Sequence, residues 1–325
     1  MEVKVYYRSS DIPTISGESE FHSKELFMIY EETHGFTPYF FTVTDGDKCI
    51  LHLVAAVRRD KPIFPQWLFR RCVIYGCGKF DADNNNKEQA FELLLGYLSK
   101  EVIRSSFLIE FRDLEDPKFG YRSFTKNHYF PINWLKVHNS LHGDITVEQR
   151  LSSSRLRQIK KGLRNGAIVE EAQSDDDVME FSRMLRHVYS SHIRKYFPDK
   201  AFFHHLYKKW HESGKTKIFI VRYKDKIIGG SVCLYSGNNA YLWFSGGMRK
   251  TYALQYPGVL AVWKAIEDAR QCGYWHFEFM DVGLPFKKHG FREFVLRFGG
   301  KQSSTRRWYR FRWRWLNKIC IKLYR

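Results

Sequence analysis

The chain lacks the features that mark several large protein classes. No apolar run in its 325 residues approaches the ~20 residues of a membrane-spanning helix, and the longest runs, such as residues 49–57, have strand length. The opening residues, MEVKVYYRSSDIP, contain no apolar stretch typical of a signal peptide. We therefore expect a cytoplasmic protein that is soluble or peripheral on the inner face of the cell membrane.

Metal-ligand patterns are also missing. The six cysteines are scattered, and no second pair of Cys or His completes a metal site with Cys72 and Cys77. We expect no metal and reduced cysteines that pack as small apolar groups. Neither a cysteine nucleophile with recognisable partners nor a zinc finger, RRM signature or basic zipper can be identified.

Acidic residues are outnumbered, with 35 Asp and Glu against 53 Lys and Arg, which gives a net charge of +18. Such a field attracts nucleic acid, anionic lipid head groups or phosphorylated substrates. Since 17% of the residues are aromatic, a non-catalytic protein that grips a polyanion and stacks bases remains an alternative. Apolar residues make up 44%, which is ordinary for a chain with a real core.

The two halves of the chain repeat one order of elements: a hairpin, a strand that runs into glycines, a helix and a short strand. In the first half these are predicted at 39–43 with 50–57, 73–75, 87–104 and 107–111. In the second half they are predicted at 218–223 with 227–234, 240–244, 257–271 and 275–279. The last strands align, FLIEFRD with WHFEFMD, which indicates an internal duplication.

Residues 138–149 contain Gly143 and few apolar runs, so we expect a hinge there. A basic helix follows, capped by serines at 152–154 and ended by Asn165-Gly166. The segment 175–217 has room for two ordinary helices before the second hairpin.

Local sequences in the second half resemble the GNAT acyltransferase fold. KIIGG at 226–230 resembles its hairpin, and YLWFSGG at 241–247 resembles the strand before the acyl-donor site. YPGVLAVW at 256–263 resembles the following helix, and FVLRFGG at 294–300 the closing segment. Together they resemble the FemAB/FemX-like branch, the tandem-domain peptidoglycan bridge-forming transferases and their relatives. The resemblance covers 150–310, and the first half only through the duplication.

This resemblance implies an α+β protein of two tandem GNAT-like domains, each a mixed, mostly antiparallel sheet flanked by helices. It places a degenerate domain at 1–145, the acyltransferase domain at 146–310 and a basic aromatic tail at 311–325. The implied function is N-acyl transfer from acyl-CoA to an amine of a cell-envelope or lipid-linked precursor at the cytoplasmic membrane face. A transferase fold that has lost its activity is a further alternative.

Two departures bear on the acyl donor. Val295 stands where relatives often have Lys, and residues 175–217 leave no room for the long charged helical hairpin of some aminoacyl-tRNA-using members. The missing hairpin favours acyl-CoA as co-substrate. An aminoacyl-tRNA-dependent bridge transferase stays the alternative, and nucleic acid is a partner only in that case.

GNAT enzymes hold a pyrophosphate on a Gly-rich turn at a helix N-terminus. The matching stretch supplies these candidate donor-binding residues: Gly246, Gly247, Arg249, Lys250 and Tyr256. It lacks a clean Gln/Arg-x-x-Gly-x-Gly, so a turn with solvated cations is the competing interpretation.

Three residues are candidates for catalysis. Asp281 follows a strand end and could orient an amine or take its proton, although turn Asp residues are common. Glu278 alternates with two phenylalanines and therefore points to the opposite face. Tyr241 could protonate the leaving group, or it is a core aromatic.

The cations Arg155, Arg157, Lys287 and Arg292 suit a phosphate or carboxylate of the acceptor, and solvated basic side chains are the competing interpretation. The candidate substrate-binding residues are Arg155, Arg157, Trp243, Lys287 and Arg292. From residue 301 on there are nine cations and no carboxylate, mixed with Trp, Ile, Leu and Tyr. We interpret this tail as an interfacial anchor on anionic lipid.

Overall fold

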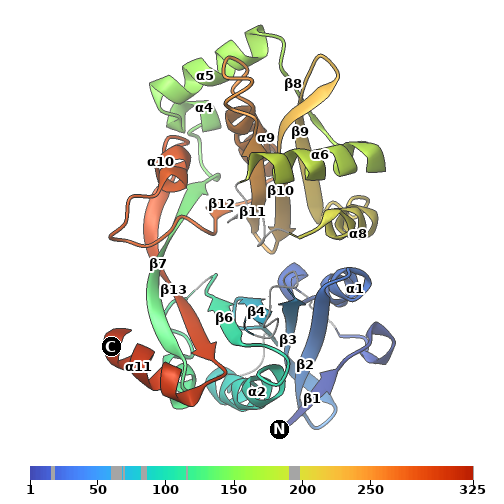
Figure 1. Ribbon diagram of the computed structural model, residues 1–325, viewed down its shortest axis with the longest axis vertical. Helices are drawn as coiled ribbons and strands as arrows, with labels where there is room; N and C mark the ends of the chain where they lie inside the picture. Colours follow the sequence, from blue (N-terminus) through green and yellow to red (C-terminus); the bar gives the residue numbers. More distant parts are fainter. Residues whose placement is uncertain are drawn as a thin grey trace. The chain divides into compact units, whose positions relative to one another are not determined.

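The computed structural model describes residues 1–15, 19–59, 68, 70–81, 86–114, 116–189 and 198–324 (Figure 1). Within these residues, no helix combines the length and the apolar character needed to span a bilayer. The chain divides into two compact units, Met1–Trp134 with Ser304–Arg325, and Leu135–Ser303.

The first unit is one sheet in the order β1-β2-β3-β4-β6-β13, with β5 paired to β3. Its strands are β1 (Glu2–Tyr6), β2 (Phe36–Asp45), β3 (Lys48–Arg59), β4 (Arg70–Tyr75), β5 (Lys79–Phe80), β6 (Leu108–Arg112) and β13 (Lys301–Phe311). Its α-helices are α1 (Lys24–Glu32), α2 (Lys87–Val102), α3 (Tyr121–Lys126) and α11 (Arg314–Tyr324), with 3-10 turns at Ser9–Asp11 and Glu20–His22. Strands β4 and β6 are parallel, and the other neighbours along this path are antiparallel.

Helices cover both faces of this sheet. Phe40 and Phe41 are neighbours on β2 and therefore point to opposite faces. The ring of Phe40 meets Phe27 of α1, and the ring of Phe41 meets Tyr97 of α2. Helix α2 buries the predicted periodic apolar residues completely, as its amphipathic pattern requires: Phe91, Leu94, Leu95, Leu98 and Val102.

The second unit is a sheet in the order β8-β9-β10-β11-β12-β7. Its strands are β7 (Phe130–Ser140), β8 (Ile168–Glu171), β9 (Thr216–Tyr223), β10 (Lys226–Ser236), β11 (Asn239–Gly247) and β12 (His276–Phe279). Its helices are α4 (Val147–Arg150), α5 (Ser153–Arg164), α6 (Asp175–Val188), α8 (Lys200–Trp210), α9 (Pro257–Gln271) and α10 (Gly290–Leu296). Strands β11 and β12 are parallel, and the other neighbours are antiparallel.

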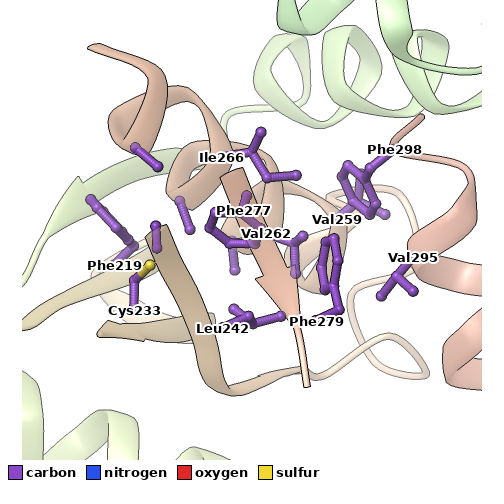
Figure 2. Close-up of a cluster of buried hydrophobic side chains, with 14 of the residues drawn as sticks. Phe219, Cys233, Leu242, Val259, Val262, Ile266, Phe277, Phe279, Val295 and Phe298 are labelled. Carbon is purple, nitrogen blue, oxygen red and sulfur yellow. The ribbon is translucent and has the colours of Figure 1, made fainter. Parts of the chain in front are cut away.

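Two adjacent glycines of β10 show how the helices lie on this sheet. A Cβ atom on Gly229 would come within 2.7 Å of Pro257 in α9, and one on Gly230 within 2.6 Å of Phe181 in α6. Because neighbouring strand residues face opposite ways, α9 and α6 cover opposite faces (Figure 1). Figure 2 shows the core on the α9 face, where Val259 and Val262 lie against Phe279 and Phe277.

The two units share their pairing scheme, which matches the predicted duplication. In the first, Glu110 of β6 is paired with Val73 of β4 and Tyr309 of β13. In the second, Glu278 of β12 is paired with Tyr241 of β11 and His138 of β7. The α+β class is confirmed.

The last strand of each sheet comes from the other half of the chain. Strand β7 runs across the unit boundary and pairs with β12, while β13 runs back and pairs with β6. The units therefore differ from the predicted limits at 145 and 310, because residues 304–310 lie in the first unit and 135–145 in the second. The expected hinge at 138–149 is wrong for residues 138–140, which are part of β7.

Candidate functional site

Strands β11 and β12 part in the second unit. They pair from Asn239 with His276 to Leu242 with Phe279, and β12 ends there while β11 continues to Gly247. On its other side β11 stays paired with β10, with an irregularity opposite Val232 and Cys233. The edge of β11 beyond Leu242 is thus not covered by β12, and backbone N–H and C=O groups at such an edge need partners.

The end of β11 lies against the start of α9. A Cβ atom on Gly247 would come within 2.4 Å of the Gly258 nitrogen, so only glycine permits this approach. Tyr256 caps the helix in the left-handed region at φ 49°, which is uncommon for a residue other than glycine. The Tyr256 carbonyl accepts from the amides of Val259 and Leu260.

Helix α5 fixes the loop that leads into α9. The Asn165 side chain donates to the Leu254 carbonyl at 2.9 Å, and a Cβ atom on Gly162 would lie 2.6 Å from the Gln255 carbonyl. Arg249 and Lys250 are exposed in this loop. Helix-terminal amides, a helix dipole and two cations fit a phosphate or pyrophosphate group.

A row of polar side chains crosses the sheet on the face opposite α9. Phe277 and Phe279 point into the α9 core, so Glu278 between them faces the other way. The strand register places Glu278 beside Tyr241 and His138. Three strands therefore bring a carboxyl, a phenol and an imidazole together, one residue before β11 and β12 part.

Burial controls the protonation of this row. Glu278 is only 8% exposed, and burial raises the pKa of its carboxyl. The ammonium of Lys136, whose Nζ lies 3.7 Å from Glu278 Oε2, opposes this shift. Burial, together with nearby Lys136, also lowers the pKa of His138 and of His276. A raised pKa makes the Glu278 carboxylate a stronger proton acceptor than a fully solvated carboxylate.

The two aromatic candidates on β11 are held by packing. Tyr241 is 4% exposed, and its hydroxyl accepts a hydrogen bond from the Asn239 side chain at 3.4 Å. Trp243 is half-buried, stacks on Phe244 and meets Phe202 of α8 edge-on. Tyr241 thus belongs to the polar row, and Trp243 lies beyond it on the part of β11 that β12 does not cover.

The loop after β12 holds the remaining candidates. Asp281 and Lys287 are exposed. Arg292 of α10 donates to the carbonyls of Leu284 at 2.8 Å and Lys287 at 2.6 Å, so it fixes this loop. Between them Phe286 is 96% exposed.

Arg155 is buried, at 2% exposure, in contrast to exposed Arg157 on the same helix. Its guanidinium donates to the Phe294 carbonyl at 2.6 Å and lies 4.4 Å from the ring centroids of both Phe294 and Phe298. Burial, with Arg297 nearby, lowers its pKa to about 10, so it stays charged at neutral pH. Arg155 thus joins α5 to the segment that contains α10.

Strand β7 contributes site residues that were not predicted from the sequence. Lys136 and His138 face Glu278, and His142 just after the strand lies 5.3 Å from His276 between ring centroids. The available signal was the alternation of Lys136, His138 and Ser140 with buried Val137 and Asn139. No group of three or more His, Cys, Asp or Glu suited to a metal occurs in the described part of the chain.

The matching glutamate of the first unit has the opposite electrostatics. Glu110 is fully buried, and the guanidiniums of Arg71, Arg112 and Arg307 pair with it. Burial alone would raise its pKa, but these three cations outweigh burial and lower the pKa to about 2. Glu110 is therefore ionised at physiological pH and is a weak proton acceptor.

Comparison with known proteins agrees with this geometry. Residues 153–288 match a family described as an acetyltransferase (GNAT) domain. FemX has a similar structure, with 12% identity over 99% of both chains and a TM-score of 0.65. A tandem GNAT protein from the clavulanic acid biosynthesis pathway shares 8% identity over 96% of this chain and 99% of its own, with a TM-score of 0.54.

A C-terminal domain assigned to a lysylphosphatidylglycerol synthetase from Agrobacterium fabrum is 11% identical over 83% of both chains, with a TM-score of 0.52. No curated protein sequence matches the chain. At these identities the structural likeness concerns the fold, and the acyltransferase class rests on the family match; GNAT domains in general use acyl-CoA. The resemblance inferred from the sequence is confirmed: the chain has the tandem GNAT fold of FemX, and its residues 153–288 match the acetyltransferase (GNAT) domain family.

Proposed function

We propose that this chain is an N-acyltransferase that moves an acyl group from acyl-CoA to an amine where β11 and β12 part. The observation that carries the proposal is Glu278, a buried carboxyl with a raised pKa one residue before the last pair of these strands. An amine must lose a proton before or as it attacks, and a base with a pKa nearer neutrality does this best. Asp281, which is exposed in the loop after β12, is the second candidate for this role.

The donor side is the end of β11 with the start of α9. The pyrophosphate of CoA would lie at the helix N-terminus, near Gly258, with Arg249 and Lys250 as counter-charges. The amide-bearing arm of CoA would follow the edge of β11 between Leu242 and Gly247 as an added strand does. Tyr256, which caps α9, borders this region.

The chemistry then needs few groups. The amine nitrogen attacks the thioester carbon, so that a C–N bond forms and the C–S bond breaks. Glu278 takes the amine proton, and the hydroxyl of Tyr241 gives a proton to the departing thiolate. Backbone N–H groups at the parted strands can stabilise the oxyanion, and positioning supplies much of the remaining rate.

Acceptor contacts divide into two groups. Exposed Arg157 and Lys287 can bind a phosphate of the acceptor, and exposed Asp281 can orient its amine. Trp243 can border the acceptor. By contrast, Arg155 and Arg292 donate to carbonyls of their own fold, so we assign them to holding α10 and its loop.

The acceptor is proposed to be a phosphorylated or lipid-linked precursor of the cell envelope, modified at the cytoplasmic face of the membrane. The net charge of +18 supports an anionic acceptor. The likeness to a domain assigned to a lysylphosphatidylglycerol synthetase supports a lipid-linked one, since that protein is named for a lipid product.

Calorimetric titration tests the donor first. Purified protein is titrated with CoA, with a panel of short acyl-CoA molecules and with charged tRNA. We expect micromolar binding of CoA species that rises for one acyl chain length, and binding retained by Glu278→Gln with its turnover lost. Binding of charged tRNA but not of CoA species would indicate an aminoacyl transferase. Absence of binding by either donor would favour a transferase fold without activity.

A further inference from the structure

The C-terminal helix α11 carries an exposed apolar stripe. Trp315, Ile319 and Leu323 are 56%, 47% and 72% exposed. Residues four apart lie on one side of a helix, so the three side chains form a continuous row along α11. A contiguous exposed row of large apolar groups marks an interaction surface, unlike apolar residues scattered singly.

The rotation of α11 is fixed by one buried side chain. Asn317 is 3% exposed, donates to the Phe311 carbonyl at 2.7 Å and accepts from the Phe311 amide at 2.8 Å. Trp315 and Ile319 are each two residues from Asn317, about 200° around the helix. These two hydrogen bonds, which we call the Asn317 clip, join α11 to the end of β13 and keep the apolar stripe on the exposed side of the helix.

Charge decides which partner fits the stripe. Lys318 and Lys322 are exposed beside it, and residues 301–325 contain nine cations without a single carboxylate. A second copy of the chain seated on this face would bring like charges together. An anionic bilayer surface matches both the cations and the Trp, Ile and Leu side chains, because lysine stems can lie along apolar surface with their charges at the phosphates.

We propose that α11 docks on the surface of an anionic bilayer, with Trp315, Ile319 and Leu323 in the interfacial layer and Lys318 and Lys322 at the lipid phosphates. The helix has 11 residues, about 16 Å at 1.5 Å per residue, which suits a helix lying on a membrane. Trp313 stacks on Trp315 and meets Phe107 edge-on, which connects the stripe to the sheet of its unit. Docking of α11 on a bilayer does not depend on the proposed reaction or on the acyl donor.

Vesicle sedimentation of the full chain tests the proposal. Vesicles of phosphatidylcholine alone are compared with vesicles that also contain phosphatidylglycerol, at low salt and at a salt concentration that screens the bulk charge. The variant Trp315→Ser/Ile319→Ser/Leu323→Ser keeps every charge and the Asn317 clip. We expect its partition onto the mixed vesicles to fall at least tenfold at the higher salt.

A matched control removes three exposed apolar side chains elsewhere, Ile145→Ser/Leu163→Ser/Ile168→Ser, which are 51%, 40% and 59% exposed. This control should bind vesicles as the unchanged chain does, and Lys318→Gln/Lys322→Gln should lose much of the dependence on phosphatidylglycerol. Equal binding by the α11 variant would overturn the proposal. So would a concentration-dependent dimer that the α11 variant abolishes, which would identify a second copy as the partner. CoA binding measured on the same samples reports separately on the proposed function.

Discussion

Two glutamates at equivalent positions of the two units differ in their electrostatic environment. Glu278 and Glu110 occupy the same place in their two sheets, each beside a partner on the strand from the other half. One lysine lies near Glu278, whereas three arginines surround Glu110. The pKa of a buried carboxyl is raised when few cations offset the loss of solvation. The pKa is lowered when several guanidiniums pair with the carboxylate. The contrast explains why we locate the chemistry in the second half.

Replacing Glu278 by Gln should lower kcat by a factor of about 100 or more, the usual share of a general base. Its raised pKa means that the ionised form is disfavoured by folding. Glu278 therefore contributes stability that is present below the unfolded pKa and is lost as pH rises through the folded pKa, and the Gln variant lacks this pH-dependent contribution. In urea unfolding at pH 4.5 and 7.5, the stability of Glu278→Gln relative to the unchanged chain should be greater at the higher pH. An unchanged kcat would remove Glu278 from the mechanism.

Glu110→Gln should behave in the opposite way. With a pKa lowered to about 2, Glu110 contributes stability that is complete above the unfolded pKa and fades as pH falls towards 2. We expect this variant to lose about 3 kcal/mol of unfolding free energy at pH 7, a loss that shrinks in acid. Urea unfolding extended from pH 7.5 down to about pH 2.5 measures it, with kcat of the folded fraction at pH 7.5 as control. Equal destabilisation at every pH would contradict the electrostatic cause.

Arg155→Met separates a structural cation from one that binds substrate. The variant leaves the Phe294 carbonyl without its donor and removes two cation–ring contacts, so unfolding free energy should fall by about 2–3 kcal/mol. The KM for the acceptor should stay unchanged. Arg157→Met, on the exposed side of α5, is the matched control and should leave stability intact. A raised KM at full stability for Arg155→Met would restore its predicted binding role.

Among the elements, the contact of β11 with α9 decides the geometry of the donor side. Pro257 starts the helix, and glycines at 229, 247 and 258 let its first turn approach two strands. The sequence already indicated this helix start, since Pro at the first position is typical. The approach of two backbones depends on side chains missing from both strands, which only the fold reveals.

Gly247→Ala should displace the start of α9, because the new Cβ would lie 2.4 Å from the Gly258 nitrogen. Overpacking of this kind costs about 1–3 kcal/mol, and we expect CoA binding to weaken with it. In Gly258→Ala the Cβ would be 3.8 Å from Gly247, so stability should be kept. Thermal unfolding and CoA titration of both variants make the comparison, and equal effects would speak against the close approach as the cause.

At the scale of the whole molecule, the two halves exchange their last strands. Strand β13 supplies Arg307 to Glu110 and Trp308 to the first core, where its ring stacks on Phe124 at 4.6 Å. Trp308 is 1% exposed. Neither half of the chain thus contains all residues of one core, and the two units are joined by two strands.

Residues 1–134 alone should not unfold cooperatively, because β6 lacks its neighbour and Phe124 its stacked ring. Joining 304–325 to this fragment through a flexible Gly/Ser linker should restore a cooperative transition. Near-UV circular dichroism and urea unfolding of both fragments measure this. A sharp transition in the short fragment would show that β13 is dispensable.

The sequence by itself determined the elements whose causes are local. Neighbours in the chain determine the hairpin turns, the periodicity of α2, the start of α9 at Pro257 and the duplicated Glu-Phe-x-Asp strings. The hairpins, the helices and the tandem α+β organisation could therefore be predicted. What only the tertiary structure decided were non-local pairings. The place of β7 beside β12 and the burial of Arg155 depend on residues more than a hundred positions apart. The exposure of Asp281 and the opposite pKa shifts of the two aligned glutamates depend on solvent access and on the cations that the fold brings to each carboxyl. Strand pairing and desolvation are set by such contacts, which no local pattern encodes.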